Sequence, residues 1–185
     1  MIIMGIDPGT NLMGYALVRN VGKKPSVLGI GTLDMRKLDG HLEKLREIHL
    51  SLGRLLELYT PDHLAIEAPF FHKDVQAMLK LGRAQGMAIA AAYAKGIAVT
   101  EYLPKVVKKA VVGNGNASKE QVAGMLPHLV DNLDLTGLPL DASDALAVAV
   151  CHCFQSSGLG GQKGKRYDDW GAFAKNNPDK LKSDK

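Results

Sequence analysis

Cysteine and aromatic residues are scarce in this sequence, and long apolar runs are missing. Only 2 of the 185 residues are cysteines, and aromatic residues make up 5% of the chain. Cys151 and Cys153 stand two positions apart on a predicted helix, where their side chains diverge, so we expect reduced core thiols rather than a disulfide or a zinc site. No apolar stretch reaches the roughly 18 residues of a membrane span. We therefore expect a soluble, cytoplasmic protein.

A strong charge of one sign is also absent. The formal net charge is +4, and most of the excess lies near the end of the chain, where residues 155–185 hold seven Lys or Arg against four Asp. A mild positive charge favours polyanions as partners without identifying one. With 46% hydrophobic residues, the chain can bury one core. We expect one domain over residues 1–155, followed by a basic, flexible tail over residues 156–185.

The hydrophobic periodicity predicts three antiparallel strands, followed by strands that alternate with helices. Ser118 and Gln121 form a predicted capping box, and we expect Pro127 to kink or end the helix that begins there. The expected strands are 2–7, 13–20, 26–33, 63–68 and 97–103, and the other expected helices are 41–59, 75–95, 105–112 and 141–154. This order indicates an α/β fold with a mixed sheet of about five strands flanked by helices.

Four carboxylates stand at the ends of apolar elements, where a solvated acid has no evident reason to lie. Asp7 and Glu67 each end a predicted strand, and Asp141 and Asp144 open an apolar helix on one shared face. Ligands of open α/β sheets collect at the carboxyl ends of strands. Because carboxylate oxygens are natural ligands of Mg²⁺, the four acids predict a metal-dependent active site and phosphate chemistry.

Five segments carry a resemblance to a known family. They are GIDPGT, IEAPFF, LKLGRAQG, EYLPKVVKKAVVGNGNASKEQV and DASDALAVAVCH. In this order and spacing the chain resembles the RuvC family, the Holliday junction endonucleases of bacteria. The resemblance implies an RNase H-like fold, a homodimer, and Mg²⁺-dependent, symmetric nicking of two strands of a four-way DNA junction. It also implies work alongside RuvA and RuvB, the junction-binding and branch-migration proteins.

Under this interpretation each acid receives a role. Two Mg²⁺ ions, for which Mn²⁺ can substitute, would relieve charge on the attacking and leaving oxygens of a phosphodiester. We expect Asp7, on a buried strand, to bridge the ions, and Glu67 and Asp144 to complete their shells. Asp141 is expected to act as a further ligand or as the base that positions water. No organic cofactor is expected.

Lysines near the expected helices predict contacts with the DNA backbone. Lys108 and Lys119 match positions where the family places bases that bind DNA. Lys105 and Lys109 lie beside them, and Lys105, Lys108 and Lys109 share one helical face. A run of lysines is more often a solvated helix face. Here the Gly-rich loop 113–116 links this face to Lys119, so we expect all four to grip phosphates.

The loop after Glu67 carries a predicted stacking residue. Phe70 matches the family position whose aromatic ring stacks on unpaired bases at the junction centre. The chain then departs from the family, because it reads His72, Lys73 and Asp74 where relatives tend to have Gly-Lys-Asn. This departure puts the loop's substrate contacts in doubt and leaves the metal site untouched.

The segment from 75 to 95 contains Gly82, Gly86 and Ala90 at four-residue intervals. Glycine inside a helix costs roughly 1 kcal/mol relative to alanine, so a close packing partner should compensate. Tight packing on the sheet would supply this, and so would self-association. The family uses this region in its dimer, and we expect the same two-fold contact here.

Two other classes of protein remain as alternatives. Actin-like and sugar-kinase ATPases also end a strand in Asp-x-Gly-Thr, but they need two such lobes and do not predict an acid pair at the start of a helix. The second alternative is a junction-binding protein that has lost catalysis. The presence of all four acids argues against it.

Overall fold

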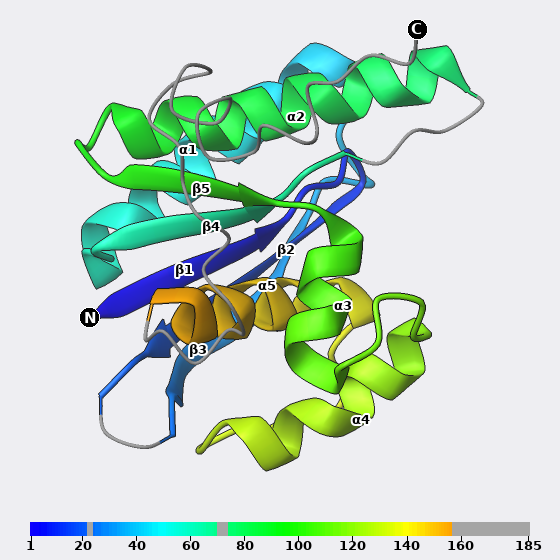
Figure 1. The fold of residues 1–185 in the computed structure, drawn as a ribbon. Coiled ribbons are helices and arrows are strands. Elements are labelled where there is room, and N and C mark those ends of the chain that lie inside the picture. Colours follow the sequence, from blue (N-terminus) through cyan, green and yellow to red (C-terminus); the bar gives the residue numbers. More distant parts are fainter. Residues whose placement is uncertain (22–23, 70–73, 157–185) are drawn as a thin grey trace, which may run out of the picture.

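A mixed sheet of five strands forms the centre of the fold (Figure 1). The computed structural model describes residues 1–21, 24–69 and 74–156. Its strands are β1 (Ile2–Asp7), β2 (Leu12–Arg19), β3 (Ser26–Asp34), β4 (His63–Glu67) and β5 (Ala98–Tyr102). They lie in the order β3-β2-β1-β4-β5, with β2 antiparallel to both of its neighbours and with β1, β4 and β5 parallel.

Helices cover both faces of this sheet. They are α1 (His41–Tyr59), α2 (Val75–Tyr93), α3 (Pro104–Val112), α4 (Lys119–Leu129) and α5 (Leu140–Ser156). Figure 1 shows α1 and α2 on one face and α5 on the other, with α3 and α4 packed beside α5. Two apolar clusters fill the spaces between sheet and helices, one on each face. None of these helices in the described part of the chain is both long and apolar enough to cross a membrane.

The predicted α/β architecture with a mixed five-stranded sheet is confirmed. Strand 2–7 and helix 41–59 have the predicted bounds, and the other elements differ from prediction by one or two residues at their ends. Ser118 and Gln121 form the predicted capping box. Helix α4 continues to Leu129, two residues past Pro127, because a proline near the last turn removes only one helical hydrogen bond. Beyond Ser156, the predicted tail lies outside the described residues.

Two glycines bring α5 into direct contact with the sheet. A Cβ atom at Gly5 of β1 would lie 2.2 Å from the carbonyl oxygen of Ala145, and one at Gly14 of β2 would lie 1.9 Å from that of Asp141. Any side chain at these positions would push the helix away. The two glycines therefore set how closely the first turns of α5 approach β1 and β2.

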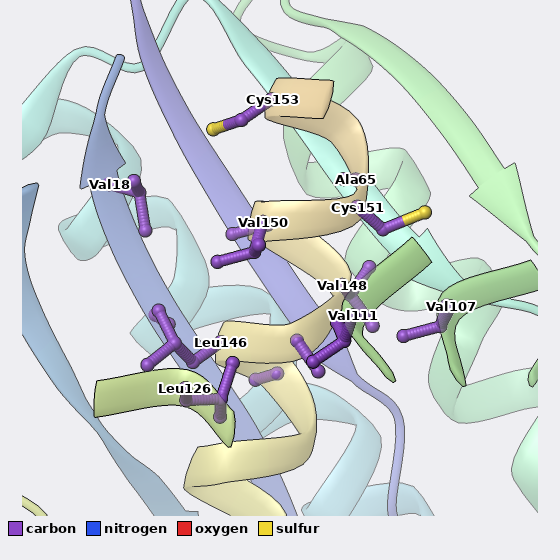
Figure 2. Packing of buried hydrophobic residues seen from close by; sticks show 14 of the residues in the cluster. Val18, Ala65, Val107, Val111, Leu126, Leu146, Val148, Val150, Cys151 and Cys153 are labelled. Carbon is purple, nitrogen blue, oxygen red and sulfur yellow. The ribbon is translucent and has the colours of Figure 1, made fainter. Parts of the chain in front are cut away.

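The apolar body of α5 is the second reason for its position. Leu146, Val148 and Val150 are fully buried, and Figure 2 shows these side chains among those of the strands and of α3 and α4. In the same view the thiols of Cys151 and Cys153 point in different directions. Both cysteines are free and buried, as predicted, and burial raises the pKa of each thiol to about 12. They are therefore inert core residues.

The segment between α4 and α5 is tied to the far edge of the sheet. Asp131 pairs with Ser26 of β3 in an isolated parallel bridge, and its carbonyl oxygen accepts a hydrogen bond of 3.0 Å from Val27. Its side chain forms an ion pair of 3.2 Å with Lys24. Helix α4 is thus held at its start by the capping box and just beyond its end by β3.

Two histidines form a polar chain inside the core. His63 Nε2 lies 2.8 Å from the Thr100 hydroxyl, and His152 Nδ1 lies 2.9 Å from the Tyr102 hydroxyl. The two imidazole rings stack with centroids 4.2 Å apart. Burial, and then the neighbouring His63, lower the pKa of His152 to about 4. The fold therefore favours the neutral ring of His152, and both histidines have a structural role.

The buried, neutral His152 makes the free energy of unfolding sensitive to acid. The pKa of His152 rises from about 4 in the fold toward its ordinary 6.5 in the unfolded chain, so its contribution is complete above pH 6.5 and is lost as the pH falls toward 4. We expect a His152→Phe/Tyr102→Phe double variant to lose less melting temperature between pH 7 and pH 5 than the wild type. His128→Phe, which changes an exposed ring on α4, is the control. Equal losses in all three proteins would contradict this.

Candidate active site

Asp7 and Glu67 end two neighbouring parallel strands and face the same side of the sheet. In the β1–β4 pairing Ile6 lies opposite Ile66, and both isoleucines belong to the cluster under α1 and α2. Because side chains alternate along a strand, the next residue of each strand points to the other face, toward α5. The two carboxyl groups are hydrogen-bonded to each other. Acids that are 60 positions apart in the sequence are thus in contact.

Asp144 joins this pair from the second turn of α5. Its charge acts on both Asp7 and Glu67, and its carboxylate forms an ion pair with Lys119, the first residue of α4. The side chain of Asp144 is only 13% exposed, against 58% for that of Lys119. A largely buried carboxylate needs such a partner, because an unpaired charge there would be strongly destabilising.

Asp141 occupies the first turn of the same helix, three residues before Asp144. It is partly buried, and its charge acts on Lys119. The structure therefore brings Asp7, Glu67 and Asp144 together directly, and it places Asp141 at the margin of this group, next to the lysine that they share.

The local environment favours protonation of the acid pair. Burial, and then the charges of Glu67 and Asp144, raise the pKa of Asp7 well above its ordinary value. Burial also raises the pKa of Glu67, reinforced by Asp144 and opposed by its contact with Asp7 and by the nearby lysines. For Lys119, burial acts to lower the pKa, but the ion pair with Asp144 raises it overall. One ammonium group does not balance this much buried negative charge.

A hollow lined by parts of β4, α3, α4 and α5 opens onto these acids. Its lining residues are Glu67, Pro104, Val107, Lys108, Lys119, Val122, Asp144 and Ala147. Two of the four predicted DNA-binding lysines therefore face it, and Lys108 is close enough for its charge to lower the pKa of Glu67. Lys105 and Lys109 lie exposed on the surface of α3. Lys108 and Lys119 are thus the two lysines nearest to the acids, and the contact of all four lysines with the DNA backbone stays a prediction.

The donor set fits a hard divalent cation in its chemistry. All candidate ligands are carboxylate oxygens, and their buried charge exceeds what Lys119 offsets. In the part of the chain that the structure describes, no group of three or more His, Cys, Asp or Glu is arranged to hold a metal ion. The Asp144 carboxylate pairs with Lys119, and the Asp7 carboxyl group is hydrogen-bonded to that of Glu67, so each of these groups already has a partner within the protein. Binding of a cation requires this pairing to change.

Two further expectations concern neighbouring segments. Phe70, the predicted stacking residue, and the departure at His72 and Lys73 lie outside the described residues. Glu101 of β5 accepts a hydrogen bond of 2.9 Å from Gln85 of α2, on the face of the sheet away from α5. This acid is therefore a structural residue and does not join the group of Asp7, Glu67 and Asp144.

Sequence reasoning missed one feature of this site. It assigned Lys119 to the DNA backbone alone, whereas the structure pairs this lysine with Asp144. No local pattern predicts that pairing, because the residues are 25 positions apart and meet only through the packing of α4 on α5.

Comparison with known proteins identifies close relatives. The family model described as crossover junction endodeoxyribonuclease RuvC matches residues 3–152. The chain is 50% identical over 183 residues to the crossover junction endodeoxyribonuclease RuvC of Porphyromonas gingivalis, covering 98% of this chain and 97% of that protein. It is 49% identical to the protein of the same name from Bacteroides fragilis, covering 98% and 96%.

Solved structures agree with these matches. Thermus thermophilus RuvC in complex with a Holliday junction substrate is 31% identical, with a TM-score of 0.79 over 86% of this chain and 97% of that one. The yeast mitochondrial Holliday junction resolvase Ydc2 has a TM-score of 0.64 over 85% of this chain and 81% of its own. At 15% identity, the yeast protein is similar in fold alone. The expected RNase H-like fold is confirmed.

The crowded acids should destabilise the protein when no metal ion is bound. Asp7 has a pKa above its ordinary 3.8 in the fold, so the folded state binds more protons between the two values and stability falls as the pH rises through that window. We expect Asp7→Asn to raise the melting temperature in EDTA at pH 8 by several degrees, since 1 kcal/mol corresponds to about 2–4 °C for this size. At pH 4 the difference should vanish.

Asp34→Asn is the matched control for this measurement. Its hydrogen bond and charge contact with Arg36 lower the pKa of Asp34 to about 2, so removing the charge there gives no gain at pH 8. If Asp7→Asn melted below the wild type at pH 8 in EDTA, the assigned repulsion would be wrong.

Proposed function

Because this chain belongs to the RuvC family of crossover junction endodeoxyribonucleases, we propose that it resolves four-way DNA junctions by paired, symmetric nicks that require Mg²⁺. That it is a Holliday junction resolving endonuclease follows from the family. The proposal concerns how its own residues do this. The observation that carries it is the meeting of Asp7, Glu67 and Asp144 from β1, β4 and α5.

The proposed ligands are Asp7, Glu67, Asp144 and, at the margin, Asp141. Two Mg²⁺ ions per site, or Mn²⁺ in their place, would stabilise charge on the attacking and the leaving oxygen of the phosphodiester. In this proposal Asp7 would be a ligand of both ions, because β1 is buried along most of its length and lies between two paired strands, which fixes the position of this side chain. Asp141 is the acid best placed to orient water, because it lies outside the central contact.

Two contacts within the protein must change before the proposed ligands can bind a metal ion. Asp7 and Glu67 hold a proton more readily than ordinary carboxyl groups, and they must release it before both can act as ligands. Lys119 must also turn away from Asp144, because its ammonium group occupies the carboxylate that would bind the ion. Its ammonium group then lies beside the hollow with Lys108, where both can contact a backbone phosphate next to the bond that is cut.

The remaining DNA contacts in the proposal flank the site. Lys105 and Lys109 are exposed on α3, on either side of Lys108 in the sequence, and their contacts would orient the strand without reading its sequence. The Gly-rich loop supports this surface, because a Cβ atom at Gly115 would lie 3.0 Å from the carbonyl oxygen of Lys105. Phe70 remains the proposed stacking residue because it matches the family position.

The proposed enzyme is a homodimer that associates through α2. Gly82, Gly86 and Ala90 are exposed, and nothing lies within 4 Å of a Cβ atom built on either glycine. Val75 and Leu79, which precede Gly82 on the same helix, are 65% and 52% exposed. An exposed apolar stripe with small residues at its centre allows two helix backbones to approach closely across a two-fold axis.

The family resemblance supports further partners. RuvA and RuvB are the proposed branch-migration partners of this enzyme. The two RuvC proteins that are about 50% identical to it come from Porphyromonas gingivalis and Bacteroides fragilis. The DNA of such bacteria lies in the cytoplasm, so that is the proposed compartment. The two alternatives, an actin-like or sugar-kinase ATPase and a catalytically silent binding module, receive no support from the matches.

Cleavage of a mobile four-way junction tests the proposed function. With Mg²⁺ we expect paired nicks in the junction and none in linear duplex, and with EDTA we expect none in either. Asp7→Asn should bind the junction but cut at least about 10³-fold more slowly, because a metal ligand contributes several kcal/mol to the barrier. Glu101→Gln, an acid that contacts Gln85, should cut like the wild type. Metal-independent nicking, or full activity of Asp7→Asn, would overturn the assignment.

Substitution of one exposed glycine tests the dimer. Gly86→Leu leaves the fold of one chain unhindered, because nothing lies within 4 Å of a Cβ atom built at that position. In a dimer it should weaken association by about 10- to 100-fold, the usual effect of overpacking at 1–3 kcal/mol. Gly124→Leu in α4, equally free of neighbours, is the control. Sedimentation should show a dimer for the control and a monomer for Gly86→Leu, and a monomeric wild type would contradict the proposal.

A further inference from the structure

A second group of basic residues lies on the face of the sheet away from α5. It consists of His41 and Lys44 in the first turn of α1 and Lys80 and Arg83 in the second and third turns of α2. We call these four residues the α1–α2 cluster. Burial, and then the charges of Arg83, Lys80 and Lys44, lower the pKa of His41, so the two helices bring all four groups close together.

Sheet topology places the α1–α2 cluster at the same edge as the catalytic acids. Strands β1, β3 and β4 run in one direction, so their carboxyl ends share an edge. Helix α1 follows β3, and α2 follows β4, so both begin there. A contact confirms it: the Lys44 ammonium donates a hydrogen bond of 2.6 Å to the side chain of Asn11, in the turn after β1, four residues past Asp7.

Among the described residues, the cations of the α1–α2 cluster are set apart by their lack of an acidic partner. Within residues 1–21, 24–69 and 74–156, no carboxylate forms an ion pair with Lys44, Lys80 or Arg83. Lys80 and Arg83 are exposed. Like charges held together without an acid repel one another, and a polyanion that neutralises them gains free energy from this and from the release of its counterions.

Neighbouring cations on the same two helices behave differently. Arg46 pairs with Glu43, and Arg54 pairs with Glu47, both on α1. Lys95, beyond the far end of α2, pairs with Glu57 at 2.5 Å. Unpaired cations on α1 and α2 therefore concentrate, within the described part of the chain, at the edge that carries the catalytic acids.

We propose that the α1–α2 cluster binds backbone phosphates of one duplex arm of the junction. Lys108 and Lys119 lie on the α5 side of the catalytic acids and the α1–α2 cluster lies on the other, so phosphates would be held on both sides of the bond that is cut. Arg83 can engage a phosphate through two parallel hydrogen bonds, and the lysines act as point charges. This inference rests on the proposed function and extends its DNA surface across the sheet edge.

The salt dependence of junction binding tests this. In an Asp7→Asn background that binds without cutting, we compare Lys80→Gln/Arg83→Gln with Lys95→Gln at a series of salt concentrations. Removal of one phosphate-binding cation should reduce the slope of log K against log salt by about 0.9, so the slope of the double variant should fall by up to about 1.8. Lys95→Gln should keep the full slope. Arg83 lies four residues after Leu79 and three before Gly86, so it borders the proposed dimer contact. Lys80→Gln alone, which lies off that stripe, is therefore compared as well: its slope should fall by about 0.9, and its melting temperature and sedimentation should match the parent protein.

A second readout reports on the α1–α2 cluster itself. Phosphates that neutralise Lys80 and Arg83 should raise the pKa of His41, which NMR measures with and without the junction. An unchanged slope in the double variant, or an unchanged His41 pKa on binding, overturns the inference. Wild-type cleavage of the junction with Mg²⁺ is measured alongside. If the wild type cuts while the slope stays unchanged, only the α1–α2 cluster assignment fails, whereas a wild type that does not cut overturns the proposed function.

Discussion

The contact of α5 with two glycines of the sheet is the constraint on which the active site depends. Carbonyl oxygens of the first turns of α5 lie where the side chains of Gly5 and Gly14 would otherwise be. The helix therefore lies directly on β1 and β2, and its acidic first turns are carried to the carboxyl end of β1. Without that approach, Asp144 would not reach Asp7. Eleven buried residues of α5 hold the helix there, so the geometry of the site is maintained by the apolar core beneath it.

The grouping of acids that the proposed chemistry needs also destabilises the folded protein. Three acids in a poorly solvated space repel one another, and they are tolerated because two share a hydrogen bond and the third pairs with a lysine. In the proposed function the same crowding would give a divalent cation its affinity, since a bound ion would remove the repulsion. The acids that lower the stability of the folded protein without metal are thus the acids proposed to bind the metal ions.

Much of the fold follows from sequence patterns, and much less of the site does. Hydrophobic periodicity predicted the strands and the helices, and Asp7 and Glu67 were recognisable as acids at strand ends. The pairing of Lys119 with Asp144, and the gathering of Lys44 with Lys80, were not predictable, because each depends on how separate helices pack. The roles of the four acids stay a prediction, as do those of Lys105, Lys108, Lys109, Lys119 and Phe70.

The two anchors of α4 have a kinetic consequence for the loading of the site. A helix fixed by its cap at Ser118 and by the bridge from Asp131 to β3 does not swing outward as a rigid arm. Lys119 can then vacate the Asp144 carboxylate only by rotating about its own side-chain bonds. Rotations of exposed side chains take picoseconds to nanoseconds, far faster than the collective movement of a helix. In the proposed mechanism the release of Asp144 by Lys119 therefore needs no movement of α4, and the slower requirement is the change in the contact between Asp7 and Glu67.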